Sequence, residues 1–536
     1  VYGGVTVSNP ANLQGRDYVN PIICADYSDP DVTTSPDGKF FYMTASSFQS
    51  TPGLPILKSA DLVNWEIVNY ALPLVPPVDY YNELPRHGKG VWAPCIRYHE
   101  GKYYIYWGDP DFGIFMIETE DPEGEWSEPV LVKGGKGWID PTPFWDEDGK
   151  AYLANGWAAS RAGFNSIITL SEMSADGKRL ISDPVIVYDG NDGINHTIEG
   201  PKLYHKDGYY YIFSPAGGVV DGWQLVMRSK NIYGPYESKI VMAQGETDIN
   251  GPHQGAWITT ADGENWFVHF QDRGAYGRII HLNPMEWKDG WPVIGNDKDG
   301  DGCGEPVKKW RKPAIASHSR KHNDKSGGSK IDTSMLYQWH GNYNEFFGFP
   351  SNDALIRIYG HKVSDEFVNL WEVPNLWLQK FPAEKFTFTS NVRITAKQSA
   401  EGVSSGIVVM GWDYARLGLE KRGDEFALIF TDCKDAEQGG AELRRDVAIV
   451  KPTRVYNAGL HPNLECDIFL RVSVGEGGNC SFSYSTDGKN YQPAGTFKAR
   501  AGKWIGAKVG FYSITPAGVS DRGWIDVKDS EIKINK

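Results

Sequence analysis

Three carboxylic acids stand at matched places in a repeated pattern of this 536-residue chain. Asp29, Asp140 and Glu199 each lie eight residues before an acidic residue that is followed directly by glycine. One carboxyl group can donate a proton to a departing oxygen while a second takes a proton from an attacking water molecule. Such a reaction needs two carboxyl groups, and this chain offers three. Their roles therefore depend on how the surrounding strands and turns position them.

The acidic-glycine pairs are typical of tight hairpin turns, because glycine accepts positive φ and each pair precedes a strand-like aromatic run. The pattern occurs five times, at unequal intervals that average about fifty-odd residues, within the period range of propellers and solenoids. In a propeller, equivalent positions of all blades face one central channel. The spacing therefore predicts that the positions eight residues before the turns converge on one axis. They are Asp29, Trp92, Asp140, Glu199 and Gln254, the last with His253 beside it.

Each carboxylate also has a purely structural interpretation. Asp29 in SDPD and Asp140 in WIDPTP precede proline, where an aspartate often caps a turn. Glu199 in IEGP is harder to explain in that way, since an apolar strand rarely takes an unpaired glutamate. Their matched positions favour a functional interpretation of the three together.

The composition indicates a large all-β protein. Aromatic residues make up 13% of the chain, with 19 Trp, 28 Tyr and 60 Gly, a mixture typical of many short strands. The net charge is −14 and no basic stripe occurs, so we expect no nucleic-acid partner. We also expect no membrane span, because the sequence has no run of about 18 apolar residues. The six Cys lack metal-binding spacing and are expected to be buried free thiols.

The repeats divide the chain into two expected domains. Residues 1–310 carry the five repeats and are predicted to form a five-bladed β-propeller. Residues 311–331 are polar and basic with a Gly-Gly pair, as in a linker. Residues 332–536 show alternating strands, as in 385–396, which predict a β-sandwich.

The acidic stretch NDKDGDGCGE at 296–305 has a partial calcium-loop pattern. Asp297, Asp299 and Asp301 alternate as in an EF-hand, but the glutamate of the twelfth position and the flanking helices are missing. We therefore favour an acidic turn and keep a structural calcium ion as the alternative.

The motifs around the repeats resemble the blade motifs of glycoside hydrolase family 43. The similarity covers about residues 18–310, and a looser one extends over most of 332–530. The second half is similar to the concanavalin-like, jelly-roll sandwich that follows the propeller in the branch of β-xylosidases and α-L-arabinofuranosidases. The segments that carry these resemblances are SDPDV (28–32), WIDPTPFWDEDGKAYL (138–153), HTIEGPKLYHKDGYYYIF (196–213), HQGAWITTADGENWF (253–267) and GKWIGAKVGF (502–511).

The resemblance implies an enzyme that inverts anomeric configuration and needs no cofactor for its chemistry. Asp29 would be the general base that deprotonates water, and Glu199 the general acid that protonates the leaving oxygen. Asp140 would orient Glu199 and keep the pKa of the acid raised by like-charge repulsion. An inverting pair would place the carboxyl groups of Asp29 and Glu199 roughly 6.5–9.5 Å apart, which leaves room for the water.

Further site residues carry over from the same resemblance. Trp92 and Phe48 would line the pocket, Arg278 would contact the sugar, and Trp504 of the sandwich would narrow the pocket mouth. Arg278 has a surface strand residue as its alternative interpretation, and Trp504 a sandwich core residue. His253 is expected to lie by a calcium ion or water in the channel. The complete set expected to bind substrate is Trp92, Phe48, Arg278, His253, Gln254 and Trp504.

We expect the enzyme to remove single terminal pentoses from plant cell-wall glycans such as arabinoxylan or xyloglucan. The favoured sugar is α-L-arabinofuranose, and β-D-xylosidase action on xylo-oligosaccharides is the alternative. We expect a secreted, periplasmic or cell-surface location, although VYGGVTVSNP does not have the features of a signal peptide.

Two other functions fit the same scaffold less well. A propeller of the fructosidase group would retain configuration and would need an Arg-Asp-Pro motif, which the propeller region lacks. A non-catalytic carbohydrate-binding propeller would be expected to have lost a carboxylate, yet all three are present.

Overall fold

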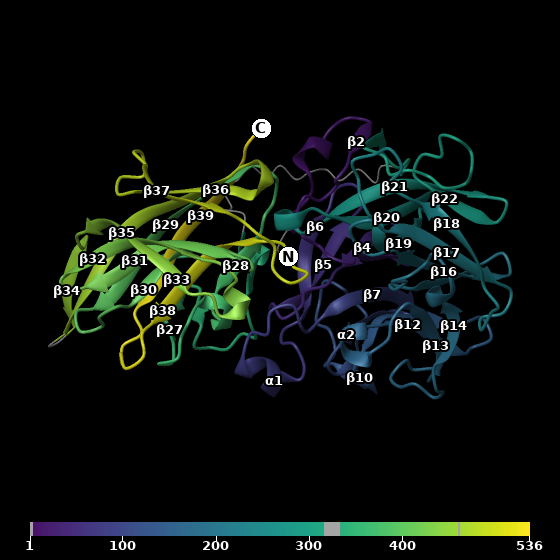
Figure 1. The fold of residues 1–536 in the computed structure, drawn as a ribbon, viewed down its shortest axis with the longest axis horizontal. Helices are drawn as coiled ribbons and strands as arrows, with labels where there is room; N and C mark the ends of the chain where they lie inside the picture. Colours follow the sequence, from purple (N-terminus) through teal and green to yellow (C-terminus); the bar gives the residue numbers. More distant parts are fainter. Residues whose placement is uncertain (1–3, 316–332, 459–460) are drawn as a thin grey trace.

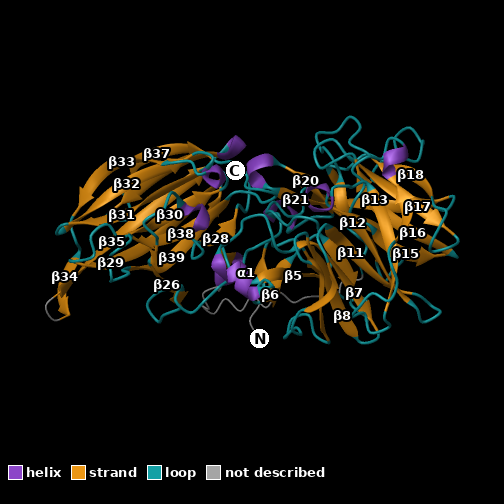
Figure 2. Cartoon of the chain, turned by 60° about the horizontal axis from the view of Figure 1, so that its bottom comes forward, coloured by secondary structure: helices purple, strands orange, loops and turns teal. Residues whose placement is uncertain are grey.

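The chain forms two β-rich parts, one from each half of the sequence (Figure 1). A computed structural model describes residues 4–315, 333–458 and 461–536. Strands dominate both parts in Figure 2, and the helices are short, such as α1 (Val78–Glu83) and α2 (Ala159–Ala162). Within the described ranges, no helix has both the length and the apolar character that a membrane crossing requires.

Five antiparallel sheets of consecutive strands form the propeller, shown from purple to teal in Figure 1. Blade one contains β3 (Asp31–Thr34), β4 (Phe41–Thr44), β5 (Gly53–Ser59) and β6 (Glu66–Leu72), with β1 (Val5–Thr6) added at its outer edge. Blade two contains β7 (Trp92–His99), β8 (Lys102–Asp109), β9 (Gly113–Thr119) and β10 (Val130–Gly134). Blade three contains β11 (Trp138–Trp145), β12 (Ala151–Trp157), β13 (Ile167–Met173) and β14 (Val185–Asp189). Blades four and five contain β15 (Lys202–Lys206), β16 (Tyr209–Ala216), β17 (Trp223–Ser229) and β18 (Glu237–Met242), then β19 (His253–Thr259), β20 (Asn265–Asp272), β21 (Arg278–Lys288) and β22 (Trp291–Ile294).

Separate apolar clusters hold the blades together, one between each pair of neighbours. Because each cluster takes side chains from two blades, no blade can bury its apolar faces alone. A cluster shared by blades five and one closes the ring. Representative members, in order around the ring, are Ile56 and Trp107, Tyr106 and Leu153, Leu170 and Ile212, Phe213 and Phe267, and Trp266 and Trp65.

The segment before blade one also closes the ring through hydrogen bonds to blade five. Ile23 forms a β-bridge with Ile280, and the side-chain amide of Asn20 donates to Leu282 O at 2.8 Å. β2 (Asp17–Val19) pairs with β23 (Lys309–Arg311), so Arg311, the expected first linker residue, ends a strand. Residues 316–331 of the predicted linker lie outside the described residues.

A residue in the left-handed region stands at the start of each innermost strand. The ladder register shifts at this place in β7, β11 and β19, which marks a β-bulge in each. A bulge breaks the strict alternation of a strand and can aim one side chain in a new direction, here toward the propeller axis. The five residues and their φ angles are Asp29 (54°), Ala93 (37°), Asp140 (54°), Gly200 (60°) and Gln254 (28°).

The spacing of eight residues does not mark the same structural position in every blade. In blades two and four, Glu100-Gly101 and Asp207-Gly208 form two-residue turns with positive φ at both positions. These turns are shorter than the loops of the other blades, so the left-handed residue comes one position later. Trp92 and Glu199 directly precede it. The prediction of strict equivalence is therefore wrong by one residue in these two blades.

The second part is a sandwich of two eight-stranded sheets, as predicted. One large apolar cluster fills the space between the sheets, and β29 (Phe386–Lys397) alternates buried with half-buried residues as expected for 385–396. The first sheet contains β24 (Tyr337–Trp339), β28 (Trp377–Lys380), β38 (Lys508–Thr515), β30 (Ser404–Met410), β31 (Tyr414–Arg422), β32 (Glu425–Cys433) and β33 (Glu442–Val450), with β27 (His361–Lys362) paired to β38. The second contains β25 (Gly348–Phe349), β26 (Ile356–Tyr359), β39 (Trp524–Ile534), β29, β35 (His461–Val474), β36 (Asn479–Ser485) and β37 (Gln492–Lys498), with β34 (Arg454–Ala458) paired to β35.

Backbone hydrogen bonds join the sandwich to the propeller. Thr51 and Trp339 exchange two of them, at 3.2 and 2.7 Å. The sandwich loop 499–507 reaches the segment that precedes β3, where Gly506 N donates to Asp26 Oδ2 at 2.9 Å. Asp26 Oδ1 accepts a further hydrogen bond from Arg278 N in blade five. One buried carboxylate therefore links the loop of the sandwich to the strand that carries Arg278.

Two lesser expectations have different outcomes. All six Cys are free, as expected, but Cys24 and Cys303 are only half-buried.

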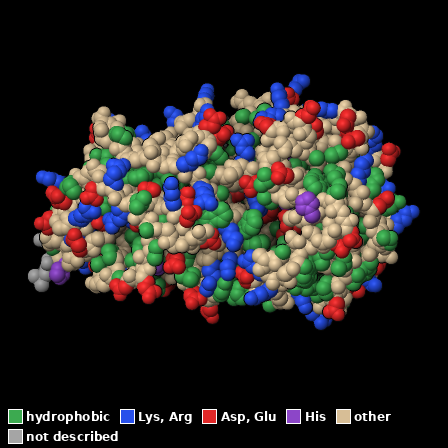
Figure 3. All heavy atoms as spheres, viewed as in Figure 1, with side chains coloured by type: hydrophobic (Ala, Val, Ile, Leu, Met, Phe, Trp, Pro, Cys, Tyr) green, Lys and Arg blue, Asp and Glu red, His purple; other side chains and the backbone are tan. Residues whose placement is uncertain are grey.

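Oxygen atoms of Asp297, Asp299 and Asp301 lie within 4.8 Å of one another at the surface. They accept hydrogen bonds from backbone N–H groups of their own loop, as in an acidic turn, and the calcium ion stays a prediction. Figure 3 shows acidic and basic side chains interspersed over one face of the molecule.

A buried ion pair crosses the middle of the propeller. Asp31 in β3 is fully buried, and its Oδ2 accepts hydrogen bonds from Ile96 N at 2.7 Å and Arg97 Nη1 at 2.6 Å in blade two. Lys202 Nζ of blade four lies 3.9 Å from Asp31 Oδ1. Three blades therefore meet at one carboxylate, and removal of a cationic partner would leave a buried charge poorly compensated.

We predict that Arg97→Met destabilises the protein by about 3–5 kcal/mol, because it leaves Asp31 buried with a weaker partner. Urea unfolding of parent and variant measures the loss. The matched control is Arg422→Met, which removes an exposed ion pair with Asp446 and should cost less than about 1 kcal/mol. Equal losses in the two variants would contradict a structural role for the buried pair.

Candidate active site

The three predicted carboxylates meet at one end of the propeller axis. Asp29 precedes β3, Asp140 lies in the bulge of β11, and Glu199 precedes β15, so all three stand where innermost strands begin. Gly200 N donates to Asp140 Oδ2 at 2.8 Å, which joins blade four to blade three. Gly156 lies between the two acids: a Cβ built there would be 3.5 Å from Asp140 Oδ2 and 3.6 Å from Glu199 Cα.

Asp140 has a pKa well above the usual range of an aspartic acid. Burial is the largest cause, and the charges of Glu199 and Asp29 raise the pKa further, while the Gly200 N–H and Lys202 oppose the shift. Only 5% of Asp140 is exposed to solvent. A group of interacting carboxyls titrates as a unit, so this site holds a proton at a pH where isolated aspartates have lost theirs.

Asp29 is held by hydrogen-bond donors. Ser28 Oγ and Ser46 Oγ each donate to Asp29 Oδ2 at 2.8 Å, and Arg278 Nη1 lies 3.4 Å from both carboxylate oxygens. These donors fix the position and orientation of the carboxylate. Among the described residues, Oδ1 has only the longer Arg278 contact, which leaves a lone pair available to a water molecule.

Glu199 is the most accessible of the three acids. Its side chain is 28% exposed, and its Oε1 lies 3.0 Å from His253 Nε2 of blade five. Its other oxygen, Oε2, has no hydrogen-bond partner in the described part of the chain. An accessible carboxyl group oriented by one neighbour can approach the oxygen of a bound substrate.

His253 and Gln254 lie against Glu199 and Gly200, and both are buried. His253 Nδ1 and Gln254 Nε2 have no hydrogen-bond partner among the described residues. A Cβ on Gly200 would lie 2.7 Å from Gln254 Cδ, and Gly200 has φ of 60°, so glycine is needed here on both counts. In the described ranges, the one group of three metal-ligating atoms is in the acidic loop and does not include His253. The calcium ion or water expected beside His253 stays a prediction.

Arg278 is fixed among polar and aromatic neighbours. Its Nη1 donates to Ser28 Oγ at 2.9 Å, and its guanidinium carbon lies 4.8 Å from the ring centre of Phe270. The same carbon lies 5.4 Å from the ring centre of Trp504, which belongs to the sandwich. Arg278 is buried and beside Asp29, so its interpretation as a surface strand residue does not hold.

Trp92 and Trp504 bring the two parts of the chain together at the site. Their ring centres are 6.2 Å apart in an edge-to-face arrangement, and Trp92 Nε1 donates to Gly88 O. Trp504 is 43% exposed with φ of 65°, so it is not a core residue of the sandwich. Phe48, by contrast, is buried and forms a β-bridge with Val91. The structure therefore brings Trp92, Arg278 and Trp504 together, and Phe48 is a buried residue of the propeller.

The sequence patterns did not reveal the residues that hold the carboxylates in place. Ser46, Asp26 and Gly156 belong to no repeated motif, and their roles depend on contacts between distant segments. Ser28 directly precedes Asp29, and that adjacency was the one signal that could have indicated a donor.

Comparisons with known proteins assign the class. Residues 18–292 match the family model "Glycosyl hydrolases family 43", and residues 330–533 match the "Beta xylosidase C-terminal Concanavalin A-like domain". The chain belongs to glycosyl hydrolase family 43, which confirms the resemblance seen in the sequence. Its active site is accordingly that of a glycosidase.

The full length of the chain resembles particular members of this family. A protein of Xylanibacter ruminicola with the provisional name beta-xylosidase is 35% identical, over 90% of this chain and 84% of that protein. A non-reducing end alpha-L-arabinofuranosidase of Bacteroides ovatus is 27% identical, over 81% of both chains. A xylan beta-1,4-xylosidase structure from Bacillus halodurans has a TM-score of 0.78 at 20% identity, covering 96% of this chain and 99% of that one, and supports the fold alone.

We predict that Asp140→Asn stabilises the protein at pH 8 but not at pH 3.5. The raised pKa of Asp140 means that the folded state holds a proton that the unfolded state releases above about pH 4, so stability falls as pH rises. Asparagine removes this loss and can still accept the hydrogen bond from Gly200 N. The difference in Tm between variant and parent should therefore grow between pH 4 and pH 8. The exposed substitution Asp365→Asn is the control, and a larger gain at pH 3.5 than at pH 8 would contradict the assignment.

We predict that Trp504→Ala raises KM on an aryl glycoside by about 2–10-fold with little change in kcat, because an aromatic contact at the substrate site is worth about 0.5–1.5 kcal/mol. Trp524→Ala, which changes another half-buried sandwich tryptophan in β39, is the matched control. An unchanged KM in Trp504→Ala would mean that the sandwich does not contribute to the binding of substrate.

Proposed function

We propose that the protein is an inverting, exo-acting glycosidase that releases single terminal pentoses from plant cell-wall glycans. The observation that carries this proposal is the meeting of Asp29, Asp140 and Glu199 at one end of the axis, with Asp140 under the influence of both other charges. The environments of Asp29 and Glu199 differ, which suits one base and one acid.

In the proposed mechanism, Asp29 accepts a proton from a water molecule through Oδ1. The water oxygen then bonds to the anomeric carbon from the face opposite the leaving group. As the glycosidic C–O bond breaks, Glu199 donates its proton to the departing oxygen. Ser28, Ser46 and Arg278 hold Asp29 in position, and inversion follows from the single displacement.

Asp140 and His253 act on Glu199 rather than on the substrate. Asp140 places a second, strongly desolvated carboxyl group beside the acid, which favours retention of a proton in the pair. His253 Nε2 lies against Glu199 Oε1 and limits the directions in which the side chain can point. His253 can also offer a nitrogen to a channel water, in line with the expectation from sequence.

Exo-action is supported by the position of loop 499–507. This loop brings Trp504 from the sandwich against Trp92 and Arg278 of the propeller. Its close backbone contact with blade five, where Ala507 N donates to Ala275 O at 2.7 Å, makes it a fixed wall. A wall on that side favours a site that accepts the end of a glycan over one that accepts its middle.

The names of the Xylanibacter ruminicola and Bacteroides ovatus relatives support β-D-xylose and α-L-arabinofuranose, respectively, as the sugar released. The longer and more similar match is named as a β-xylosidase, so we place β-D-xylosides first. The resemblance to this branch of the family had favoured α-L-arabinofuranose, and the name of the Bacteroides ovatus relative keeps it as the second candidate.

We predict measurable hydrolysis of 4-nitrophenyl β-D-xyloside, α-L-arabinofuranoside or both, with kcat/KM for each deciding the order of preference. Proton NMR of the first-formed sugar should show the inverted anomer. Glu199→Gln is the matched control and should lose about 10²–10⁴-fold in kcat on a glycoside with a poorly departing alcohol, where protonation matters most.

Three results would contradict the proposal. Net retention of configuration would remove Asp29 from the role of general base. Full activity of Glu199→Gln on the poor leaving group would remove Glu199 from the role of acid. The absence of activity on both pentosides, with activity on a hexoside, would contradict the substrate class.

A further inference from the structure

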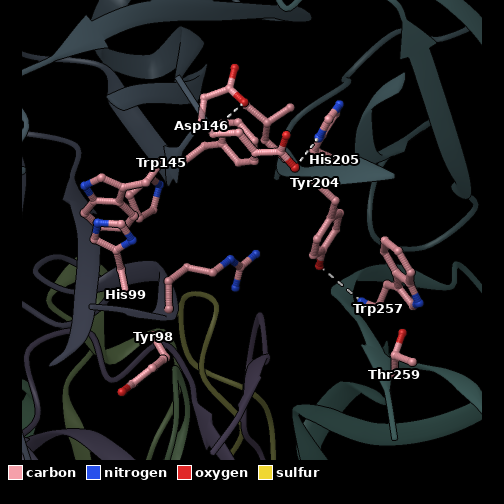
Figure 4. A pocket seen from close by; sticks show the side chains of 13 residues that line it. Tyr98, His99, Trp145, Asp146, Tyr204, His205, Trp257 and Thr259 are labelled. Atoms are coloured by element: carbon pink, nitrogen blue, oxygen red, sulfur yellow. Dashed lines mark hydrogen bonds and ion pairs between the residues drawn. The ribbon is translucent and has the colours of Figure 1, made fainter. Parts of the chain in front are cut away.

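A hollow of about 460 Å³ lies at the other end of the propeller axis, away from the carboxylates. Figure 4 shows its lining side chains from close by. It is lined by the last residues of β7, β11, β15 and β19, whereas the catalytic carboxylates stand where innermost strands begin. In β11, Trp145 is five residues beyond Asp140, about 16 Å away at the usual rise of a strand. We call this site the distal hollow, and the reaction proposed above does not use it.

Aromatic rings from four blades surround the distal hollow. One aromatic residue from each of blades two to five lines it, and each of these side chains is half-buried. They are labelled in Figure 4 as Tyr98, Trp145, Tyr204 and Trp257. The polar edges of three rings are already bound within the protein. Trp257 Nε1 donates to Asn265 Oδ1, Trp145 Nε1 donates to Ala175 O, and the Tyr204 hydroxyl accepts from Trp257 N. These bonds fix the rings before any ligand arrives, which lowers the entropy cost of binding.

The polar groups of the distal hollow suit hydroxyl groups and not an anion. Asp146 and Glu147 stand on one wall, and His205 Nδ1 lies 3.8 Å from Glu147 Oε1. Arg97 is the guanidinium of the lining, and Asp31 already pairs with it through Nη1. Its Nη2 has no hydrogen-bond partner in the part of the chain that the structure describes. Within the described part of the chain, the Tyr98 hydroxyl has no hydrogen-bond partner, and its ring meets that of Tyr103 edge to face. A ligand with a negative charge would meet two carboxylates and one compensated cation.

We propose that the distal hollow is a second, non-catalytic binding site for a neutral oligosaccharide chain. Sugar rings present flat C–H faces that pack on aromatic side chains, and hydroxyl groups that pair with carboxylates, imidazoles and a guanidinium. The volume lies in the range of about 300–1,000 Å³ that ligand sites occupy. We expect the bound chain to be the same glycan from which the active site removes terminal sugars. This identity of the ligand rests on the proposed function.

Separation of the two sites gives the distal hollow an anchoring role. A chain bound there lies at the end of the axis opposite the catalytic carboxylates. The same chain segment therefore cannot occupy both sites, and the distal hollow holds the enzyme on a polymer while the active site takes ends of other chains. Binding of two chains by one molecule raises the effective concentration of those ends.

Affinity electrophoresis of the full chain in gels with arabinoxylan, dextran or polygalacturonate tests this site. We expect arabinoxylan to slow the migration of the parent protein through the gel. Tyr98→Ala should raise the dissociation constant derived from this retardation by about 2–10-fold. The control is Tyr343→Ala, a half-exposed tyrosine of the sandwich outside both sites, which should leave retardation unchanged. Thr259→Arg is a second variant, because it fills the exposed rim of the distal hollow without removing a packed ring, and should weaken retardation equally.

Hydrolysis of an aryl pentoside by the same variants separates this inference from the proposed function. Tyr98→Ala and Thr259→Arg should keep kcat/KM within about twofold of the parent, because they leave the carboxylates untouched. Normal hydrolysis together with unchanged retardation in both variants would overturn the distal site alone. Stronger retardation by polygalacturonate than by arabinoxylan would overturn the neutral ligand. Retardation without hydrolysis of any pentoside would overturn the proposed function and leave the distal site standing.

Discussion

Mutual repulsion among three neighbouring carboxylates, two of them buried, is the constraint on which this structure depends. Burial and the charges of Glu199 and Asp29 raise the pKa of Asp140, so the arrangement is unfavourable unless donors compensate it. The compensation comes from different blades. Gly200 N of blade four donates to Asp140, the hydroxyls of Ser28 and Ser46 in blade one bind Asp29, and Arg278 of blade five approaches the same carboxylate.

Because the donors are spread around the ring, the site exists only when the ring is closed. Apolar clusters between neighbouring blades provide most of that closure, and the pairing of Ile23 with Ile280 adds the last contact. The sandwich contributes through Asp26, which receives hydrogen bonds from Gly506 N and Arg278 N together. A disordered interface would therefore displace Arg278, and Asp29 would lose the contact that Arg278 makes with it.

The propeller axis has three layers of different chemistry. The carboxylates lie at the end where the innermost strands begin, the ion pair of Asp31 and Arg97 lies further along, and the aromatic rings of the distal hollow lie where the strands end. Lys202 connects the first two layers, since it lies 3.9 Å from Asp31 and opposes the rise in the pKa of Asp140. The order follows from strand direction, because all blades begin at the axis with their first strand.

The sequence by itself determined the propeller, the sandwich and the three carboxylates, because each depends on local signals. Glycine turns, aromatic strands and acids at nearly constant spacing are visible within about ten residues of one another. The one-residue error at Trp92 and Glu199 shows the limit of such spacing, since a two-residue turn and a longer loop share the same acidic-glycine pair. The tertiary structure alone decided that Ser46, Asp26 and Gly156 hold the site, that Trp504 leaves the sandwich core to face Trp92, and that four strand ends form a second hollow. These features join segments tens to hundreds of residues apart, and their contacts arise only when the closed ring and the docked sandwich bring those segments together.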